Sequence, residues 1–241
     1  MKIVYSTLLF FFFIYLDVHA QQKYLGSWNI LNLKYKVNEK WSLMAETQLR
    51  SLKFYDHFHY YEAKALANYN VNKNLKLTLG AGTYQTYKEG GNFVLPKNNN
   101  EFRIWPQCIL NQNIGVFTIE QRYRAEFRYT SNGYKNRFRY RFGLIYPFGK
   151  KEGKNIKPFQ FGVSNELFFT DNEPYFERNR LLFNLNYKLT KTVLFQIGFM
   201  HQFDYKINDE TGRDVFLIGF YYEIIKKNDT KENDKLEIND N

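Results

Sequence analysis

The chain of 241 residues contains a single cysteine and, beyond its first twenty residues, no long apolar run. One cysteine excludes an intramolecular disulfide framework, and Cys108, beside Ile104 and Leu110 on an apolar face, is interpreted as an inert wall residue. The lack of a later apolar run of about 18 residues argues against a membrane-spanning helix. Tyrosine and phenylalanine are instead abundant, with 20 and 24 copies, and this content favours many amphipathic strands.

The first twenty residues have the features of a cleaved signal peptide. Lys2 supplies a basic start, residues 3–16 form an apolar run, and Val18-His19-Ala20 ends in small residues at the positions that a signal peptidase reads. A retained helical anchor is disfavoured because the run is short for a span. A lipoprotein would need a cysteine where Gln21 stands. We therefore expect residues 1–20 to be a signal peptide, residues 21–225 one barrel domain, and residues 226–241 a charged, disordered periplasmic tail.

The formal net charge is +10. In a cytosolic protein such a surplus would suggest nucleic acid as a partner. For an exported protein, the phosphates of lipopolysaccharide or a small anionic solute are the expected acidic partners, and nucleic acid is not.

Between Val116 and Tyr129 the sequence V-F-T-I-E-Q-R-Y-R-A-E-F-R-Y alternates strictly. Aromatic and aliphatic side chains fall on one face of a strand, and Glu and Arg fall on the other, because side chains alternate with period two. Residues 137–146 repeat the design. Lipid on one side and water on the other would explain both segments, as in the wall of an outer-membrane β-barrel. An exposed sheet of a soluble sandwich is the alternative.

Eleven strand-like segments can be counted, separated by short turns that alternate with longer loops. A segment of about 13 residues, at roughly 3.3 Å per residue and a tilt near 45°, crosses an outer membrane. The pattern predicts an all-β fold, an antiparallel transmembrane β-barrel of about 10–12 strands. The segments are approximately Ser27 to Asn38, Trp41 to Leu52, Phe58 to Val71, Leu75 to Tyr87, Glu101 to Gln112, Val116 to Thr130, Arg137 to Phe148, Lys157 to Thr170, Glu177 to Leu189, Thr192 to Phe203 and Asp214 to Ile225.

Two irregularities are expected in this barrel. Bacterial single-chain barrels have even strand numbers, so the first segment, in which Trp28 and Ile30 share one phase and Leu31 and Leu33 the other, is expected to hold a bulge or two elements. Pro106 cannot donate to a ladder, which predicts a further bulge.

Several stretches carry a resemblance to a known family. They are N-E-L-F-F at residues 165–169, Y-F-E-R-N-R at residues 175–180, Q-I-G-F-M-H-Q at residues 196–202, and the Arg-rich stretches E-Q-R-Y-R-A-E-F-R-Y and R-F-R-Y-R-F. Together they resemble a Gram-negative, Bacteroidetes-type family of outer-membrane barrels known as domain of unknown function 2490. The resemblance implies the fold and a location in the cell outer membrane, and it supplies no activity.

The charged face of the strands is expected to point into the lumen, where charges cost least. One interpretation is an interstrand salt-bridge lattice that fills a narrow lumen, because the planar Arg fork pairs bidentately with carboxylates. The other is a porin-like conduit or binding cavity for anions, because basic groups outnumber acidic ones. The residues assigned to this lumen network are Glu46, Arg50, Glu62, Lys64, Glu120, Arg122, Arg124, Glu126, Arg128, Arg137, Arg139, Arg141, Glu166, Arg178 and Arg180.

One motif raises catalysis. The stretch Tyr129-Thr130-Ser131-Asn132-Gly133 resembles the H-x-S-N-G stretch of outer-membrane phospholipases, which implies Ser131 as a nucleophile at the membrane rim. The position of that family's His base holds Tyr129, and a phenol is a poor base at neutral pH. Ser131 is therefore a weak catalytic candidate. A barrel without enzymatic activity is expected, and a lipid hydrolase that uses this serine is the alternative.

Metal and cofactor sites are not expected. His57 and His59 form an i, i+2 pair, but no Cys or carboxylate cluster with ligand spacing accompanies them. The expected partners are outer-membrane lipid and lipopolysaccharide, with small anions as further candidates.

Overall fold

A computed structural model describes residues 24–150, 157–205 and 211–225. The expected signal peptide (1–20) and charged tail (226–241) lie outside these residues. No helix in the described part of the chain is long and apolar enough to cross a membrane.

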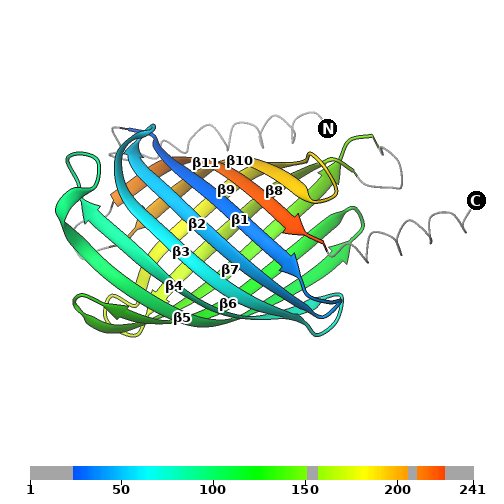
Figure 1. The fold of residues 1–241 in the computed structure, drawn as a ribbon, viewed down its shortest axis with the longest axis horizontal. Helices are drawn as coiled ribbons and strands as arrows, with labels where there is room; N and C mark the ends of the chain where they lie inside the picture. Colours follow the sequence, from blue (N-terminus) through cyan, green and yellow to red (C-terminus); the bar gives the residue numbers. More distant parts are fainter. Residues whose placement is uncertain (1–23, 151–156, 206–210, 226–241) are drawn as a thin grey trace, which may run out of the picture.

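Eleven strands form one closed barrel (Figure 1), which confirms the prediction of an antiparallel barrel of about 10–12 strands. Consecutive strands pair antiparallel all the way round, and β1 closes the ring by pairing in parallel with β11. The strands are β1 (Gly26–Lys36), β2 (Trp41–Lys53), β3 (Asp56–Asn70), β4 (Leu75–Lys88), β5 (Val94–Ile114), β6 (Phe117–Thr130), β7 (Gly133–Phe148), β8 (Phe159–Thr170), β9 (Phe176–Lys188), β10 (Val193–Asp204) and β11 (Thr211–Ile224).

The expectation that the first segment holds a bulge or two elements is wrong. β1 is a single strand whose register with β2 and with β11 runs without a shift. Apolar residues occur on both faces of β1, for two different reasons. Leu31 and Leu33 are exposed on the outer wall, whereas Trp28 points inward and packs with Met200 and Leu217. An odd strand number is accommodated because the last pair is parallel.

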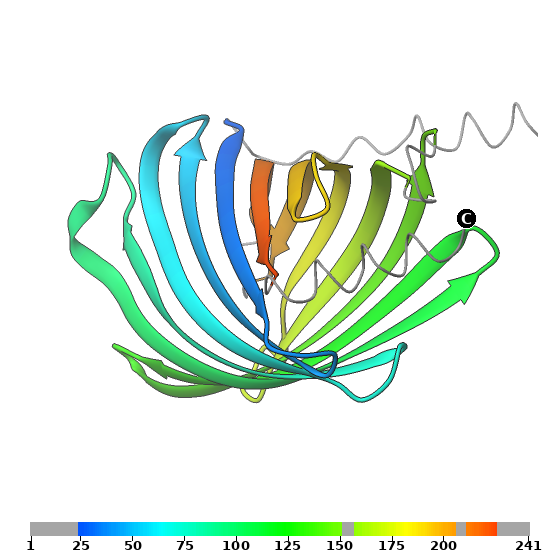
Figure 2. The same cartoon turned by 45° about the vertical axis from the view of Figure 1, so that its right-hand side comes forward.

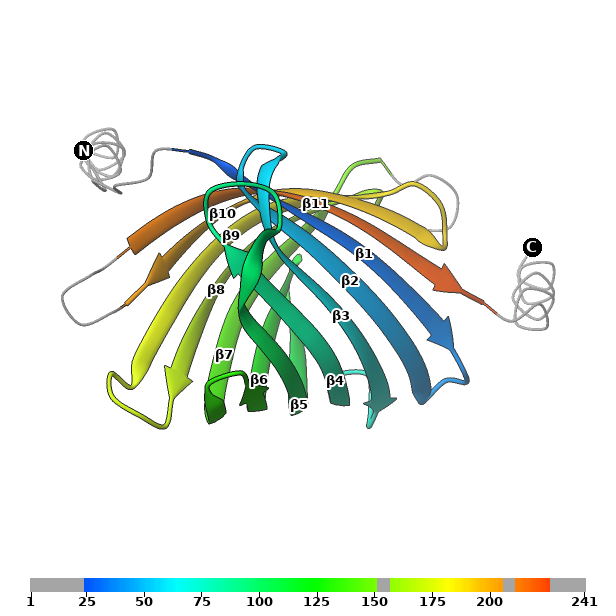
Figure 3. The same ribbon diagram turned by 60° about the vertical axis from the view of Figure 1, so that its left-hand side comes forward.

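The barrel has two rims, named here by where the chain enters and leaves it. The N-rim is the end at which β1 begins, and the C-rim is the end at which β11 ends. Figures 1, 2 and 3 show the tilted strands running between these rims, with β5 and β6 on the side of the wall opposite β1 and β11.

Among the turns that the structure describes in full, short turns do not alternate with longer loops as predicted. Strands extend into segments expected to be loops: β5 begins at Val94 rather than at Glu101, inside the expected loop from Lys88 to Asn100. The extension is supported by Phe93, whose ring centre lies 5.1 Å from that of Tyr87 on β4. The hairpins at the N-rim are therefore lengthened mainly by paired strand.

Pro106 does not cause the predicted bulge. It pairs opposite Leu79 of β4 in unbroken register, and the ladder to β6 resumes in the same register, from Ile104 with Phe127 to Gln107 with Arg124. Because proline only lacks an N–H group and adds no residue, the ladder loses contacts at this point without slipping.

A short turn covers the outside of the parallel seam between β1 and β11. Phe54, in the β2–β3 turn, lies 6.0 Å from the ring of Phe216 on β11, and the Tyr55 hydroxyl donates to Asn29 Oδ1 on β1 at 2.7 Å. Beneath this turn the hydroxyls of Ser27 and Ser51 are 2.6 Å apart and buried. The turn thus links β2 to both strands of the seam.

Alternation along each strand separates an apolar outer wall from a polar lumen. On β6, Tyr123 and Phe127 are 45% and 40% exposed, whereas Glu126 between them is 1% exposed. This difference follows directly from period two in a closed sheet.

Candidate functional site

The centre of the lumen is a buried carboxylate surrounded by guanidinium groups. Glu126 on β6 contacts four arginines from β5, β6 and β7. The shortest contact, from Arg139 Nη1 to Glu126 Oε1, is 2.6 Å, followed by Arg124 at 3.3 Å, Arg137 at 3.6 Å and Arg103 at 3.7 Å. A charged group this buried is tolerated only with such partners.

Three further carboxylates extend this cluster across β5 to β9. Glu166 on β8 pairs with Arg122 and accepts from Arg139 Nε at 3.0 Å. Glu101 on β5 accepts from Arg103 and Arg128, and Glu177 on β9 accepts from Arg137 Nε at 2.8 Å. Because Arg103, Arg137 and Arg139 each contact two carboxylates, these groups form one continuous lattice. We call it the central lattice, and it comprises Glu101, Arg103, Arg122, Arg124, Glu126, Arg128, Arg137, Arg139, Glu166 and Glu177.

A second, smaller network lies on β2 and β3. Lys64 contacts both Glu46 and Glu62, and Arg50 contacts Glu62 at 3.2 Å. The Tyr60 hydroxyl also donates to Glu62. The guanidinium carbon of Arg50 lies 3.8 Å from the ring centre of Trp28, a cation–π contact that joins this network to the seam.

Aromatic rings fill the space between the charged groups. Phe168 on β8 is 1% exposed, and four guanidinium groups lie around it at 4.5 to 5.7 Å from its ring centre, those of Arg137, Arg139, Arg178 and Arg180. Since each cation lies near a ring, part of the cost of burying it is offset by the ring quadrupole.

Trp105 on β5 is fully buried, and the Arg124 guanidinium carbon lies 5.2 Å from its ring centre. It rests on the backbone of β4 at Gly80, where a Cβ atom would come within 2.3 Å of the indole. Its ring centre is 6.4 Å from that of Tyr84. Only glycine lets the indole approach this closely.

At the two rims the ion pairs are more open to solvent. Near the C-rim, Arg141 pairs with Glu120, and Lys34 pairs with Glu223 at 3.0 Å across the seam. Near the N-rim, Arg178 pairs with Asp204. The charged lumen is therefore driest in the middle of the barrel.

All fifteen residues assigned to the lumen from the sequence contact other charged or amide side chains in the structure. The assignment missed Glu101, Arg103, Glu177 and Asp204, which lie at or next to expected strand ends where phase is hardest to read. Three of these four are carboxylates. The surplus of basic over acidic groups is therefore smaller than the sequence suggests. With these four residues and the pair Lys34–Glu223, the charged groups named here are twelve basic and nine acidic, in place of ten and five.

Ser131 lies in the β6–β7 turn at the N-rim. Its hydroxyl oxygen accepts from the Asn100 backbone N–H at 2.9 Å, and its own N–H donates to the Asn100 carbonyl at 3.0 Å. These partners are backbone amides, and none of them can serve as a base for a nucleophile. The structure gives Ser131 the geometry of a residue that ties a turn to the neighbouring strand.

The two histidines near the N-rim do not converge. His57 has φ of 57° and contacts the carboxylate of Asp56, while His59 stands opposite a register shift between Arg50 and Ser51. No group of three or more His, Cys, Asp or Glu side chains suited to a metal ion occurs within the described residues.

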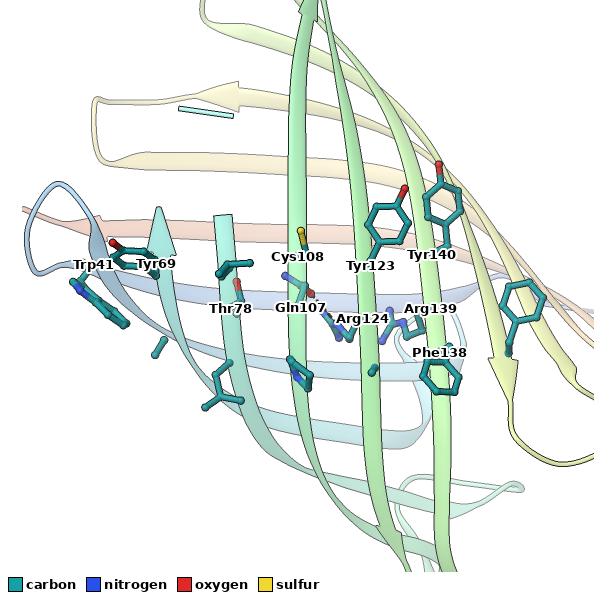
Figure 4. A pocket seen from close by; sticks show the side chains of 16 residues that line it. Trp41, Tyr69, Thr78, Gln107, Cys108, Tyr123, Arg124, Phe138, Arg139 and Tyr140 are labelled. Carbon is teal, nitrogen blue, oxygen red and sulfur yellow. Dashed lines mark hydrogen bonds between the residues drawn. The ribbon is translucent and has the colours of Figure 1, made fainter. Parts of the chain in front are cut away.

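A shallow hollow of about 800 Å³ lies on the outer wall (Figure 4). Small residues cause it, because Ala67, Pro106 and Ala125 lie between bulkier neighbours such as Tyr123 and Phe138. Figure 4 shows Cys108, Tyr123 and Tyr140 on neighbouring strands along one edge of this hollow. Its surface is apolar, and nothing in the sequence pattern predicts it.

Comparisons with known proteins agree with this geometry at the level of fold. A comparison with curated proteins finds no significant match. Among solved structures, the NanC porin in a rhombohedral crystal form is similar, with a TM-score of 0.50 and 12% identity over 83% of this chain and 97% of that chain. At this identity the likeness concerns the fold alone. The model of the family described as "Protein of unknown function (DUF2490)" matches residues 25–213, and the chain belongs to that family.

Proposed function

We propose that the protein is an outer-membrane β-barrel of porin-like architecture whose lumen is closed by its own side chains. In this proposal the central lattice and the aromatic rings hold the wall in one register, and the barrel at rest does not conduct. The exposed aromatic and aliphatic side chains of the outer wall then contact membrane lipid, as expected for a barrel of this type.

The observation that carries the proposal is the burial of inward side chains from every strand. In a water-filled lumen, inward side chains keep contact with solvent. Here each of the eleven strands contributes at least one inward side chain that is less than 9% exposed, among them Trp28, Gln48, Glu62, Tyr84, Trp105, Glu126, Arg137, Phe168, Arg180, Met200 and Leu217. Barrels of about eight strands are filled in this way, and those of 16 or more leave a channel.

Conductance of the purified barrel in a planar bilayer tests the proposal. We expect no resolved single-channel steps from the wild type, with insertion verified separately by proteolysis of reconstituted vesicles. Phe168→Ala removes the buried ring around which four guanidinium groups lie and is expected to produce steps. Regular steps from the wild type, of the size given by an open porin, would refute the closed lumen.

The surplus of basic groups supports a second candidate, a conduit that opens for small anions. In that case channels would appear under some condition of voltage or pH, and their reversal potential would favour chloride over potassium. Raising the ionic strength from about 0.1 to 1 M would weaken this preference, because the screening length falls from roughly 10 to 3 Å.

A further inference from the structure

Arg180 differs from the other arginines of the lumen. Within the described part of the chain, each of Arg50, Arg103, Arg122, Arg124, Arg128, Arg137, Arg139, Arg141 and Arg178 has a carboxylate oxygen within 4 Å. Arg180 has none there. Its Nε donates to Gln202 Oε1 at 2.8 Å, and the described residues offer no acceptor to its two terminal nitrogens.

Arg180 is buried without a direct ion pair, because the carboxylate of its register partner on β8, Glu166, pairs with Arg122 and Arg139. The residue is 8% exposed, and its guanidinium carbon lies 4.9 Å from the ring centre of Phe168 and 5.1 Å from that of Trp28. Cation–π contacts recover part of the lost hydration but supply no hydrogen-bond acceptor. A buried guanidinium in this state retains a strong attraction for an anion.

A second guanidinium group lies beside the same indole. Arg50 lies 3.8 Å from the Trp28 ring centre, and its Nη2 donates to Gln48 and Glu62. Its Nε is buried and has no hydrogen-bond partner. The Arg50 guanidinium also lies 4.3 Å from the Tyr60 ring centre, so it packs against two rings and contributes positive charge rather than a free N–H group. The terminal N–H groups of Arg180 are the donors left for an oxyanion.

We propose that Arg180, beside Trp28 and Phe168, binds an oxyanion, the carboxylate or phosphate group of a small solute that enters from the N-rim, with Arg50 adding positive charge nearby. Arg180 is the fifth residue of β9 counted from that rim, and Arg178, between it and the rim, is 23% exposed. The terminal N–H groups of Arg180 donate to two oxygens of the anion in parallel. The site goes beyond the closed barrel and does not require the lumen to conduct.

Equilibrium binding of radiolabelled inorganic phosphate to the purified barrel, in a neutral detergent at low ionic strength, tests this site. We expect one saturable site in the wild type, with affinity reduced at least tenfold in Arg180→Gln. Arg180→Lys keeps the charge, loses the bidentate geometry and should bind with intermediate affinity. Arg141→Gln removes an arginine of β7 that pairs with Glu120 instead, and it should bind like the wild type.

Thermal unfolding of the same variants separates a binding site from a structural brace. Without phosphate, Arg180→Gln should unfold at the same or a higher temperature than the wild type, because an uncompensated buried charge has been removed. Phosphate should raise the unfolding temperature of the wild type and of Arg141→Gln and leave that of Arg180→Gln unchanged. Should Arg180→Gln fail to fold, the site would be a brace and the proposal would be wrong.

Competition identifies the kind of ligand. Unlabelled phosphate and acetate should displace the label, whereas vesicles of anionic lipid should not, because a headgroup cannot enter the lumen. Displacement by the vesicles alone, equal losses in Arg141→Gln and Arg180→Gln, or no saturable binding by the wild type would each overturn the site. None of these results depends on channel measurements, so they test the oxyanion site independently of the closed lumen.

Discussion

Glu126 Oε1 and Arg139 Nη1 are 2.6 Å apart at a point of the barrel where the carboxylate is 1% exposed. Three other guanidinium groups lie within 3.7 Å of the same carboxylate. This pair therefore contributes more to the stability of the central lattice than any ion pair at the rims. If the Glu126 carboxylate is neutralised, the other three arginines also lose their shared anion.

Neutralising this carboxylate should destabilise the barrel strongly. Glu126→Gln keeps the shape and removes the charge, which leaves several buried guanidinium groups poorly compensated. We expect a loss of about 3 to 5 kcal/mol in the free energy of unfolding, measured by urea titration in lipid vesicles. Glu120→Gln, whose side chain is 22% exposed and pairs with Arg141, is the control and should lose clearly less than Glu126→Gln. Equal losses in both variants would show that burial of the lattice contributes nothing.

The close approach of Trp105 to β4 predicts an effect of a single methyl group. Gly80→Ala would place a Cβ atom within 2.3 to 2.5 Å of three indole atoms, so the ring must move. We expect a loss of about 1 to 3 kcal/mol and a shift in tryptophan emission as the indole leaves its buried position. At Gly143 the nearest atom to an added Cβ is 3.5 Å away, so Gly143→Ala should leave both stability and emission unchanged.

The energetic cost of a charged residue on the outer wall should depend on its depth in the membrane. Phe142 is exposed on the outer face near the middle of β7, and Tyr146 lies on the same face close to the C-rim. In a bilayer, Phe142→Arg should cost about 2 to 4 kcal/mol of folding stability and Tyr146→Arg about 0 to 1 kcal/mol. If the two substitutions cost the same, the outer wall does not face lipid.

The native cysteine reports on the same face without any substitution. Cys108 points outward between Leu77 and Tyr123 of the neighbouring strands. In reconstituted vesicles it should react with a lipid-soluble maleimide and resist a charged thiol reagent. As a control, Ser131→Cys on a Cys108→Ser background, at the N-rim, should react with the charged reagent. Rapid reaction of Cys108 with that reagent would contradict a membrane position.

Closure by a parallel pair can be tested with a disulfide. Leu31 and Phe220 are register partners on the outer face of β1 and β11. On a Cys108→Ser background, Leu31→Cys with Phe220→Cys should form a disulfide on mild oxidation, since adjacent strands bring Cα atoms within the required range. Leu31→Cys with Tyr222→Cys is two residues out of register and should not. A barrel closed by a further strand or in another register would give the opposite result or none.

Sequence patterning was sufficient for the fold and for the interior of most strands. Alternation is unambiguous where one face is charged, as from Glu120 to Arg128, because a one-residue slip would put every charge on the apolar wall. It failed on β1, since Trp28 and Ile30 are apolar residues that point inward. Tertiary packing with Met200 and Leu217 decides their orientation, and no local pattern records those partners.

Sequence patterning did not predict the strand ends or the closure of the ring, for a related reason. The ends are set by pairing with another strand, so Glu101, Glu177 and Asp204 were not recognised as lumen residues although they neutralise arginines there. The special state of Arg180 could not be predicted either. It depends on which carboxylates come within reach after eleven strands have closed.

The parallel seam also constrains the order in which the barrel can assemble. All other strand pairs join strands that are consecutive in the sequence. The pairing of β1 with β11 instead brings Lys34 to Glu223, which is 189 residues away. Local hairpins form quickly, whereas a contact of such separation carries the full entropy of loop closure. Until it forms, β1 and β11 each have an edge of unpaired N–H and C=O groups, which hydrocarbon does not tolerate. For a barrel in a membrane, as proposed here, insertion into the bilayer and closure of the seam are therefore expected to occur as one coupled event.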